Sequence, residues 1–244
     1  MITDVDRLEF LKLRKELLEK EYGRLNPQQR QAVFQVKGPL LVLAGAGSGK
    51  TSVLVNRIAY MIKYGNAYHS ERVPPSLTGA DIELMRRAAS GGDVTPEEQE
   101  RLRLIMMDNP VHPSSILAIT FTNKAAREMK ERLENMLGEA VEGIWVGTFH
   151  AACVRILRRY IDRLGYSRNF VIFDTADQQA LAKDCMKELR FNESNFPVKE
   201  VLAKISRAKD ELREPQDYAR VAGSDYRLSK IAAIYELYQK KLKS

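Results

Sequence analysis

Residues 40–51 have the order of residue types that binds phosphate groups. The stretch runs Leu-Leu-Val-Leu-Ala-Gly-Ala-Gly-Ser-Gly-Lys-Thr, so four apolar residues lead into a glycine-rich turn and then into a helical pattern. Glycines let the backbone curl until successive N–H groups point at one anion, and the following helix adds its positive dipole end. Lys50 is then placed to reach the β- and γ-phosphates of a nucleotide, and the Thr51 hydroxyl to hold Mg²⁺.

The stretch fits the phosphate-loop pattern G-x-x-x-x-G-K-[ST] at every position except the first, which is Ala44. This substitution changes little, because the later glycines provide the curl. The alternative interpretation is a glycine-rich turn between a strand and a helix that binds no ligand. Gly-Lys-Thr directly after four apolar residues is a specific signal, so we favour nucleotide binding.

The elements that position this loop alternate between strands and helices. Apolar, β-branched runs predict buried strands at 40–43, 116–121 and 144–149. Apolar spacing and capping residues predict helices at 4–22, from 26, 49–64, 80–89, from 95, 122–137 and after 149. The strand ends then carry three polar clusters: the phosphate loop, Thr120–Asn123 and Thr148–His150. We expect all three on one rim, because ligands bind beyond the carboxyl ends of parallel strands.

The fold class predicted from this alternation is α/β, with a parallel sheet flanked by helices. After Asp174 the pattern becomes helical only. The four apolar residues before Asp174 would also suit a strand that ends in a Mg²⁺-binding carboxylate. No Glu follows, however, and Thr175 to Gln178 has the spacing of a capping box, so we interpret Asp174 as part of a helix start.

Composition indicates a folded protein without a membrane segment. The chain has 244 residues and is 44% hydrophobic, which supports a substantial core. Apolar runs are too short to span a bilayer, and the acidic start is unlike a signal peptide, so we expect a cytoplasmic protein with no membrane partner. Cys153 and Cys185 are too few for a disulfide framework, and we predict that both are reduced core thiols.

The net charge of +7 permits a nucleic-acid partner without establishing one. Residues 151–170 contain five arginines and one acid, Asp162. This segment is either a solvated helix face or a track for a phosphate backbone, and charge alone supports both interpretations equally.

Four stretches together resemble superfamily 1 DNA helicases of the UvrD/Rep/PcrA type. Residues 25–33 resemble the adenine-recognising Q motif, 44–51 motif I, 118–126 motif Ia and 147–151 motif Ib. The resemblance covers about 25–65 and 114–244. It implies a P-loop NTPase (RecA-like) domain at 25–173, preceded by an amphipathic helix at 1–24 and followed by an all-helical inserted subdomain at 174–244.

The resemblance also implies ligands and their residues. ATP and Mg²⁺ would be bound by residues of the Q motif and motif I: Asn26, Gln29, Ala46, Gly47, Ser48, Gly49, Lys50, Thr51 and Ser52. Among these, Gln29 would read the adenine edge, and Lys50 and Thr51 would be catalytic. The Thr51 hydroxyl would also bind the metal. Single-stranded DNA would run along motifs Ia and Ib: Thr120, Phe121, Thr122, Asn123, Thr148, Phe149 and His150. Aromatic rings stack on bases and short polar side chains bind phosphates. The alternative is that both phenylalanines and His150 belong to the core.

The chain departs from the family pattern in three places. Ser52 stands where the family usually has an arginine that contacts the base. Residues 66–113 have no counterpart, so we predict an accessory or protein-binding insertion there. The Asp-Glu motif II, the second RecA-like domain and its arginine finger are not in this sequence. Because an arginine finger alone contributes roughly 10³- to 10⁵-fold, we expect the chain by itself to be nearly inactive.

The hypothesis from the sequence is therefore the N-terminal part of an ATP-dependent 3′ to 5′ DNA helicase acting in DNA unwinding, repair or replication. Its partners would be single-stranded DNA, a junction of single and double strands, and the remainder of the helicase chain. Three alternatives stay open: a helicase-nuclease subunit, a non-catalytic nucleic-acid-binding module, and a small-molecule P-loop kinase.

Overall fold

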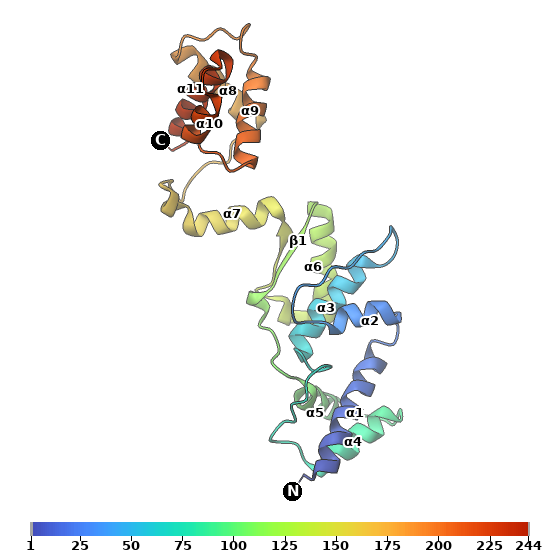
Figure 1. Cartoon of the computed structure of the whole chain (residues 1–244). Helices are drawn as coiled ribbons and strands as arrows, with labels where there is room; N and C mark the ends of the chain where they lie inside the picture. Colours follow the sequence, from blue (N-terminus) through green and yellow to red (C-terminus); the bar gives the residue numbers. More distant parts are fainter. Residues whose placement is uncertain (1, 244) are drawn as a thin grey trace. The chain divides into compact units, whose positions relative to one another are not determined.

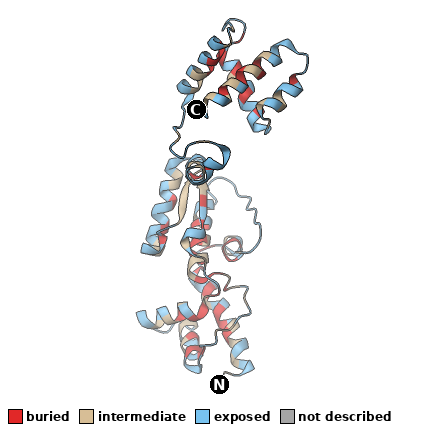
Figure 2. Ribbon diagram, turned by 90° about the vertical axis from the view of Figure 1, so that its left-hand side faces the viewer, coloured by how far each residue is buried: buried red, intermediate tan, exposed pale blue. Residues whose placement is uncertain are grey.

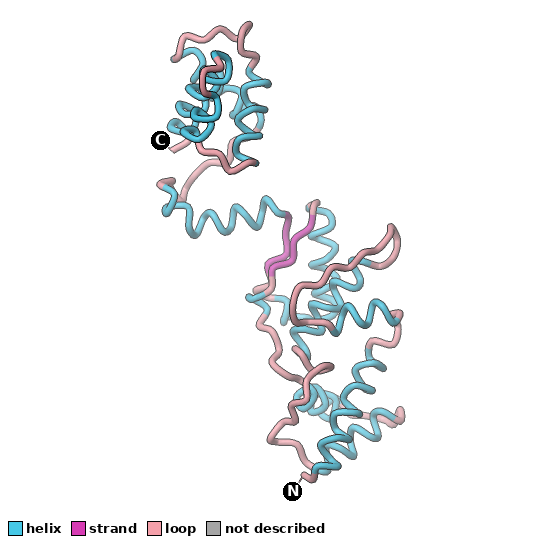
Figure 3. Tube along the Cα trace, in the orientation of Figure 1, coloured by secondary structure: helices cyan, strands magenta, loops and turns pink. Residues whose placement is uncertain are grey.

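The computed structural model describes residues 2–243, and it is mostly helical with one small parallel sheet (Figure 1, Figure 3). It divides into two compact units, Met1–Ala152 and Cys153–Ser244. The first unit contains α1 (Asp4–Glu21), α2 (Pro27–Phe34), α3 (Lys50–Tyr64), α4 (Gly79–Ala89), α5 (Pro96–Met106), β1 (Leu117–Thr120), α6 (Asn123–Leu137) and β2 (Trp145–Thr148). Helix α7 (Phe149–Tyr160) runs across the division, and the second unit continues with α8 (Thr175–Glu188), α9 (Val198–Asp210), α10 (Pro215–Ala222) and α11 (Tyr226–Lys241).

The sheet consists of β1 and β2, which run parallel and are connected through α6 (Figure 3). Leu117 lies opposite Trp145 and Thr120 lies opposite Thr148. Two of the three predicted strands therefore form, and their carboxyl ends meet at one edge. Helix α6 packs through Met129 and Leu133 into a buried cluster that includes residues of β1 and α3.

The strand predicted before the phosphate loop does not form. Residues 40–43 have no strand assignment, and Leu41 and Leu43 are 81% and 86% exposed. A β-strand needs a neighbour to pair its backbone N–H and C=O groups, and neither β1 nor β2 takes that place within residues 2–243. The prediction of a buried strand is therefore wrong for this structure in both respects, because residues 40–43 are neither paired nor buried.

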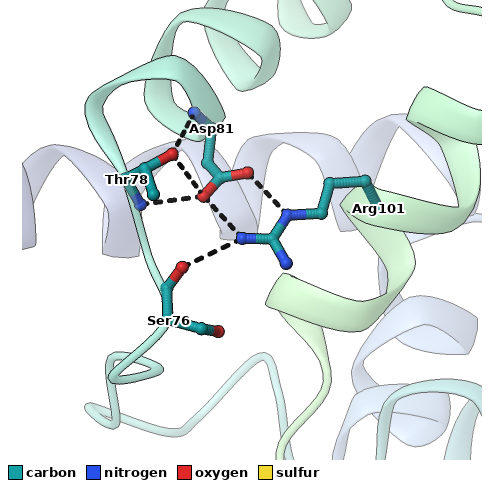
Figure 4. Close-up of polar contacts among 4 residues, drawn as sticks. All are labelled: Ser76, Thr78, Asp81 and Arg101. Carbon is teal, nitrogen blue, oxygen red and sulfur yellow. Dashed lines mark hydrogen bonds and ion pairs between the residues drawn. The ribbon is translucent and has the colours of Figure 1, made fainter.

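Helices α4 and α5, inside the segment 66–113, pack with α1 into the core that α2 and α3 share. Both helices start with capping boxes, Thr78 with Asp81 and Thr95 with Glu98, and the second confirms the sequence prediction. The Arg101 guanidinium donates twice to the buried Asp81 carboxylate at 2.7 Å and once to the Ser76 carbonyl (Figure 4). These hydrogen bonds lower the pKa of Asp81 to about 2 and fix α5 against α4.

The same segment leaves and rejoins the rest of its unit at one point. Asp108 N–H donates to the Tyr64 carbonyl at 2.9 Å, and Asn66 N–H donates to the Asp108 carbonyl at 2.8 Å. Gly65 is required at this crossing, because its φ is 63° and a Cβ there would lie 2.1 Å from the Asp108 oxygen. The ends of residues 66–107 are thus held together beside the C-terminal end of α3.

Within the second unit, α8, α9 and α11 enclose a core of their own, with Met186, Ile205 and Ile234 among its most buried side chains. Buried positions lie on the inner sides of these helices (Figure 2). Asp174 caps α8 in a box with Asp177, which confirms the interpretation of Asp174 as a helix start. No strand follows Asp174 within the described residues, as the helical pattern predicts.

The two cysteines differ in environment. Cys185 is buried in the core of the second unit, which raises the pKa of its thiol. Cys153 is exposed, so the prediction of a core thiol is wrong there. Its helix, α7, has Ala152 as its buried position and leaves the neighbouring cysteine facing solvent. Among residues 2–243, no helix is both long and apolar enough to cross a membrane.

Candidate functional site

The phosphate loop folds as a turn that ends at the first residue of α3. Gly47 and Gly49 have φ values of 74° and 82°, in the left-handed region that glycine adopts without strain. The Ser48 hydroxyl donates to the Gly45 carbonyl at 2.8 Å, which closes the turn. The N-cap residue of α3 is Gly49, so, within residues 2–243, no N-cap side chain accepts from the first N–H groups of this helix. Such an end attracts an anion.

Lys50 folds back over the loop that precedes it. Its ammonium group donates to the Gly45 carbonyl at 2.6 Å and to the Ala44 carbonyl at 3.2 Å. Lys50 and Thr51 are both exposed. The lysine charge therefore lies at the mouth of the loop, where a phosphate oxygen can replace the carbonyls as its partner.

Asn26 and Gln29 join the phosphate loop through a hydrogen bond between side chain and backbone. Asn26 caps α2 by accepting from Gln29 N–H at 2.9 Å, and the Gln29 Oε1 accepts from Asn26 N–H at 3.1 Å. The Gln29 Nε2 then donates to the Ser48 carbonyl at 3.1 Å. The predicted cap at Asn26, with Pro27 at the first helical position, is confirmed. The structure thus brings Asn26, Gln29 and Gly47 to Lys50 together.

A cavity of about 510 Å³ opens beside this contact. Gln29, Gly49 and Ser52 are among the residues that line it. Arg24, Asn56 and Arg132 also line it, and none of these three belongs to the residues predicted from the sequence. Arg132 comes from α6, far along the chain, so no local pattern could have placed it here. Asn56 lies on α3, the helix that follows the phosphate loop. Its sequence signal was a polar residue among the apolar residues of that helix.

The second group of predicted residues surrounds the shared end of β1 and β2. The Phe121 and Phe149 side chains are 90% and 50% exposed, and their ring centroids lie 5.5 Å apart. The alternative that they belong to the core is therefore wrong. Their rings offer an apolar surface to solvent beside the exposed His150.

Polar groups border the two rings. Thr122 caps α6 by accepting from Ala125 N–H at 3.1 Å, and Thr148 accepts from Ala151 N–H at 3.3 Å near the start of α7. Thr120 donates to the Thr122 carbonyl at 3.0 Å, and Asn123 is exposed at the first position of α6. Two helix starts and two aromatic rings thus gather at one edge.

The expected common rim is only partly formed. Pairing of β1 with β2 brings Thr120–Asn123 beside Thr148–His150. The strand at 40–43 that would carry the phosphate loop to the same edge is not formed, so the loop's place on that rim stays a prediction. Among residues 2–243, no group of three or more His, Cys, Asp or Glu side chains is placed to hold a metal ion.

Known proteins resemble this chain over most of its length. The UvrD/REP helicase N-terminal domain matches residues 25–79 and 98–244. Of the segment 66–113, which was predicted to have no counterpart in the family, residues 66–79 and 98–113 are matched and residues 80–97 are not. ATP-dependent DNA helicase PcrA of Bacillus subtilis (strain 168) is 44% identical over 218 residues, which cover 89% of this chain and 23% of that protein. PcrA of Staphylococcus aureus (strain Mu50) is 38% identical over 220 residues, 90% of this chain and 24% of that protein.

PcrA of Staphylococcus epidermidis is 38% identical over 218 residues, with 24% of that protein covered. The chain thus spans about a quarter of the length of these curated relatives. The match falls on both groups of residues described above, the phosphate loop with Gln29 and the aromatic edge of the sheet. The chain belongs to the UvrD/REP helicase N-terminal domain family.

Proposed function

We propose that this chain is the N-terminal part of an ATP-dependent DNA helicase and binds both ATP and single-stranded DNA. The hydrogen bond from Gln29 to the Ser48 carbonyl carries the proposal. It joins an amide that can read a base to a loop that can hold phosphates, so one nucleotide can engage both. Membership of the helicase family supports ATP rather than a phosphate ester of another kind.

The nucleotide-binding residues divide by chemistry. The N–H groups from Ala46 to Gly49 and the start of α3 suit phosphate oxygens, as does the Lys50 ammonium. The Thr51 hydroxyl is the group that would hold Mg²⁺, which supplies charge neutralisation for the phosphates when bound. Asn26 acts through Gln29, whose side chain it orients. Ser52 lines the base side of the site without a charge of its own.

Single-stranded DNA is proposed to run along the edge made by Phe121 and Phe149. Exposed aromatic rings stack on bases without selecting a sequence. The hydroxyl groups of Thr120, Thr122 and Thr148, together with Asn123 and His150, suit phosphate and sugar contacts. In the whole helicase, ATP binding and hydrolysis would move this edge along one strand, in the 3′ to 5′ direction that the family implies.

The proposed partners are single-stranded DNA, a junction of single and double strands, and the remainder of the helicase chain. The segment 66–113 is proposed as a protein-binding accessory element, since its ends are held at the C-terminal end of α3, whereas the phosphate loop lies at the N-terminal end of that helix. A cytoplasmic location follows from the DNA substrate and is proposed with it.

The test is nucleotide binding by the purified chain and by Lys50→Ala. Loss of the ammonium group removes a charge-assisted contact, so affinity for Mg²⁺·ATP should fall at least about tenfold. Lys63→Ala, at the other end of α3, is the matched control and should bind as the unchanged protein does. Equal affinity for Lys50→Ala and Lys63→Ala would contradict the proposal and favour a nucleic-acid-binding module in which the loop is only a scaffold. DNA binding that is absent at every salt concentration would favour the kinase alternative.

A further inference from the structure

Arg57 is a half-buried cation on α3 whose hydrogen bonds go to the end of another helix. Its Nη1 atom donates to the Ala32 carbonyl at 2.6 Å and also to the Gln35 carbonyl. Ala32 lies in the last turn of α2, and Gln35 is the residue at which that helix ends. Burial lowers the pKa of the Arg57 guanidinium, so holding this charge between the helices has a cost that the two carbonyls offset.

Helix α2 has no basic residue of its own in its last turn. The last carbonyls of a helix have no partner within the helix, and they carry the negative end of its dipole. Arg57 therefore supplies α2 with both a hydrogen-bond donor and a positive charge at this end. The contact matters because α2 has only eight residues, and a helix of this length is marginal without contacts at its ends.

The same short helix carries Gln29, which lies three residues before Ala32 and on the same side of α2 (Figure 1). The Gln29 Nε2 donates to the Ser48 carbonyl at 3.1 Å, and a Cβ on Gly49 would lie 3.0 Å from that nitrogen. The amide thus lies directly against the phosphate loop. Helix α2 is therefore held at two points, by the loop before α3 and by Arg57 about two turns along that helix.

We propose that Arg57 is a positioning residue for base recognition: its hydrogen bonds to Ala32 and Gln35 fix α2 on α3 and thereby hold Gln29 beside the phosphate loop. A nucleotide held by its phosphates presents its base over a narrow range of positions, so a small tilt of α2 would take the Gln29 amide out of hydrogen-bond reach. Apolar packing of α2 alone does not fix this tilt, because it is non-directional. Arg57 acts through α2 and makes no contact with the nucleotide itself.

This inference rests on the proposed function, because it requires a nucleotide in the phosphate loop with its base on Gln29. Mg²⁺·tripolyphosphate has the phosphates of ATP and no base, so calorimetric titration with both ligands separates base recognition from phosphate binding. Arg57→Met, which keeps a long side chain without the charge, should lower ATP affinity about fivefold and leave tripolyphosphate affinity unchanged. Gln29→Ala should lower ATP affinity about tenfold, again without an effect on tripolyphosphate. Lys63→Met, in the last turn of α3, is the matched control and should change neither affinity.

A double variant shows whether Arg57 acts through Gln29. If it does, Arg57→Met combined with Gln29→Ala should bind ATP no more weakly than Gln29→Ala alone, because the contact that Arg57 positions is already lost. Losses that multiply, to about 50-fold, would show that the two residues act independently and would overturn the inference.

The remaining outcomes separate the inference from the proposed function. If the unchanged chain does not bind ATP, the proposed function itself fails. If it binds ATP, and Arg57→Met weakens both ligands equally or neither of them, the inference about Arg57 is overturned while the proposed function stands.

Arg57→Lys decides the case in which Arg57→Met does not fold. Its single ammonium group can replace only part of the guanidinium contacts, so ATP affinity should still fall by about twofold or more, with tripolyphosphate affinity unchanged. Equal affinity of Arg57→Lys and the unchanged protein for ATP would then overturn the inference.

Discussion

Exposure separates Phe121 and Phe149 from every aromatic residue of the core. Core aromatics such as Phe10 and Phe34 are 0% and 3% exposed, whereas Phe121 is 90% exposed and still lies within ring contact of Phe149. Stacking of a large, exposed apolar ring on another flat apolar surface lowers the free energy, because both surfaces are removed from water. Bases of a single strand offer such a surface at every position, which suits a protein that must bind all sequences.

Phe121→Ala should therefore weaken binding of single-stranded DNA while leaving stability nearly unchanged. Base stacking contributes about 1–3 kcal/mol per base, so the dissociation constant should rise about five- to 150-fold. Fluorescence anisotropy with a labelled oligonucleotide at low salt measures this effect, and thermal unfolding checks stability. Phe173→Ala, which removes another partly exposed ring outside the proposed DNA path, is the matched control. Equal losses in the two variants would place the DNA elsewhere.

At the scale of elements, two ion pairs join α4 to α5: Arg101 with the buried Asp81, and Arg87 with Glu98 at the surface. Asp81 is 6% exposed, and its carboxylate accepts two hydrogen bonds from Arg101 and two from Thr78, one from the backbone N–H and one from the hydroxyl. The pKa of Asp81 is lowered to about 2 by these partners, first of all by Arg101. A carboxyl group whose folded pKa lies below its unfolded pKa stabilises the fold above the unfolded value, and this stabilisation is lost as pH falls toward the folded value.

We expect Asp81→Asn to lower the free energy of unfolding by about 2 kcal/mol at neutral pH, because Arg101 loses its charged partner. The difference between the variant and the unchanged protein should shrink as pH falls from about 4 to about 2, where Asp81 takes up a proton in both states. Urea unfolding across this range measures it. Asp93→Asn, in the exposed loop between the same two helices, should have no such effect. A constant difference down to pH 2 would show that the charge of Asp81 is not what stabilises the contact.

Helix starts were predictable because a cap depends on residues only three apart. Thr95 with Glu98, Asn26 with Gln29 and the start at Asp174 all lie where the sequence places them. The absence of a strand at residues 40–43 was not predictable, because a strand forms only beside a pairing partner, and the local sequence does not specify that partner. The same limit hid Arg132, which reaches the cavity through the packing of α6 on α3. Local hydrogen bonds can thus be predicted from the sequence, whereas contacts between distant segments require the structure.

At the scale of the whole molecule, compactness and sequence pattern divide the chain at different places. The compact units separate between Ala152 and Cys153, inside α7, whereas the domain boundary proposed from the sequence lies between residues 173 and 174. The proposed boundary marks the change from strands and helices to helices alone. A boundary between units that falls inside a continuous helix cannot be recognised from the sequence, since the residue pattern does not change there. We retain the boundary at 173 and 174 as a proposal about domains.

The final prediction is that the purified chain of 244 residues binds ATP without turning it over. Phosphoryl transfer needs a metal held by carboxylate as well as hydroxyl, and a positive charge on the developing transition state. Thr51 and Lys50 can begin such a site, but Asp174 is engaged in capping α8, and no cluster of acidic and His side chains within residues 2–243 is ready to complete it. We therefore expect nucleotide binding that weakens when EDTA removes Mg²⁺, and no phosphate release above background when single-stranded DNA is added. Phosphate release stimulated by DNA and abolished in Lys50→Ala would show that this chain carries a complete catalytic site.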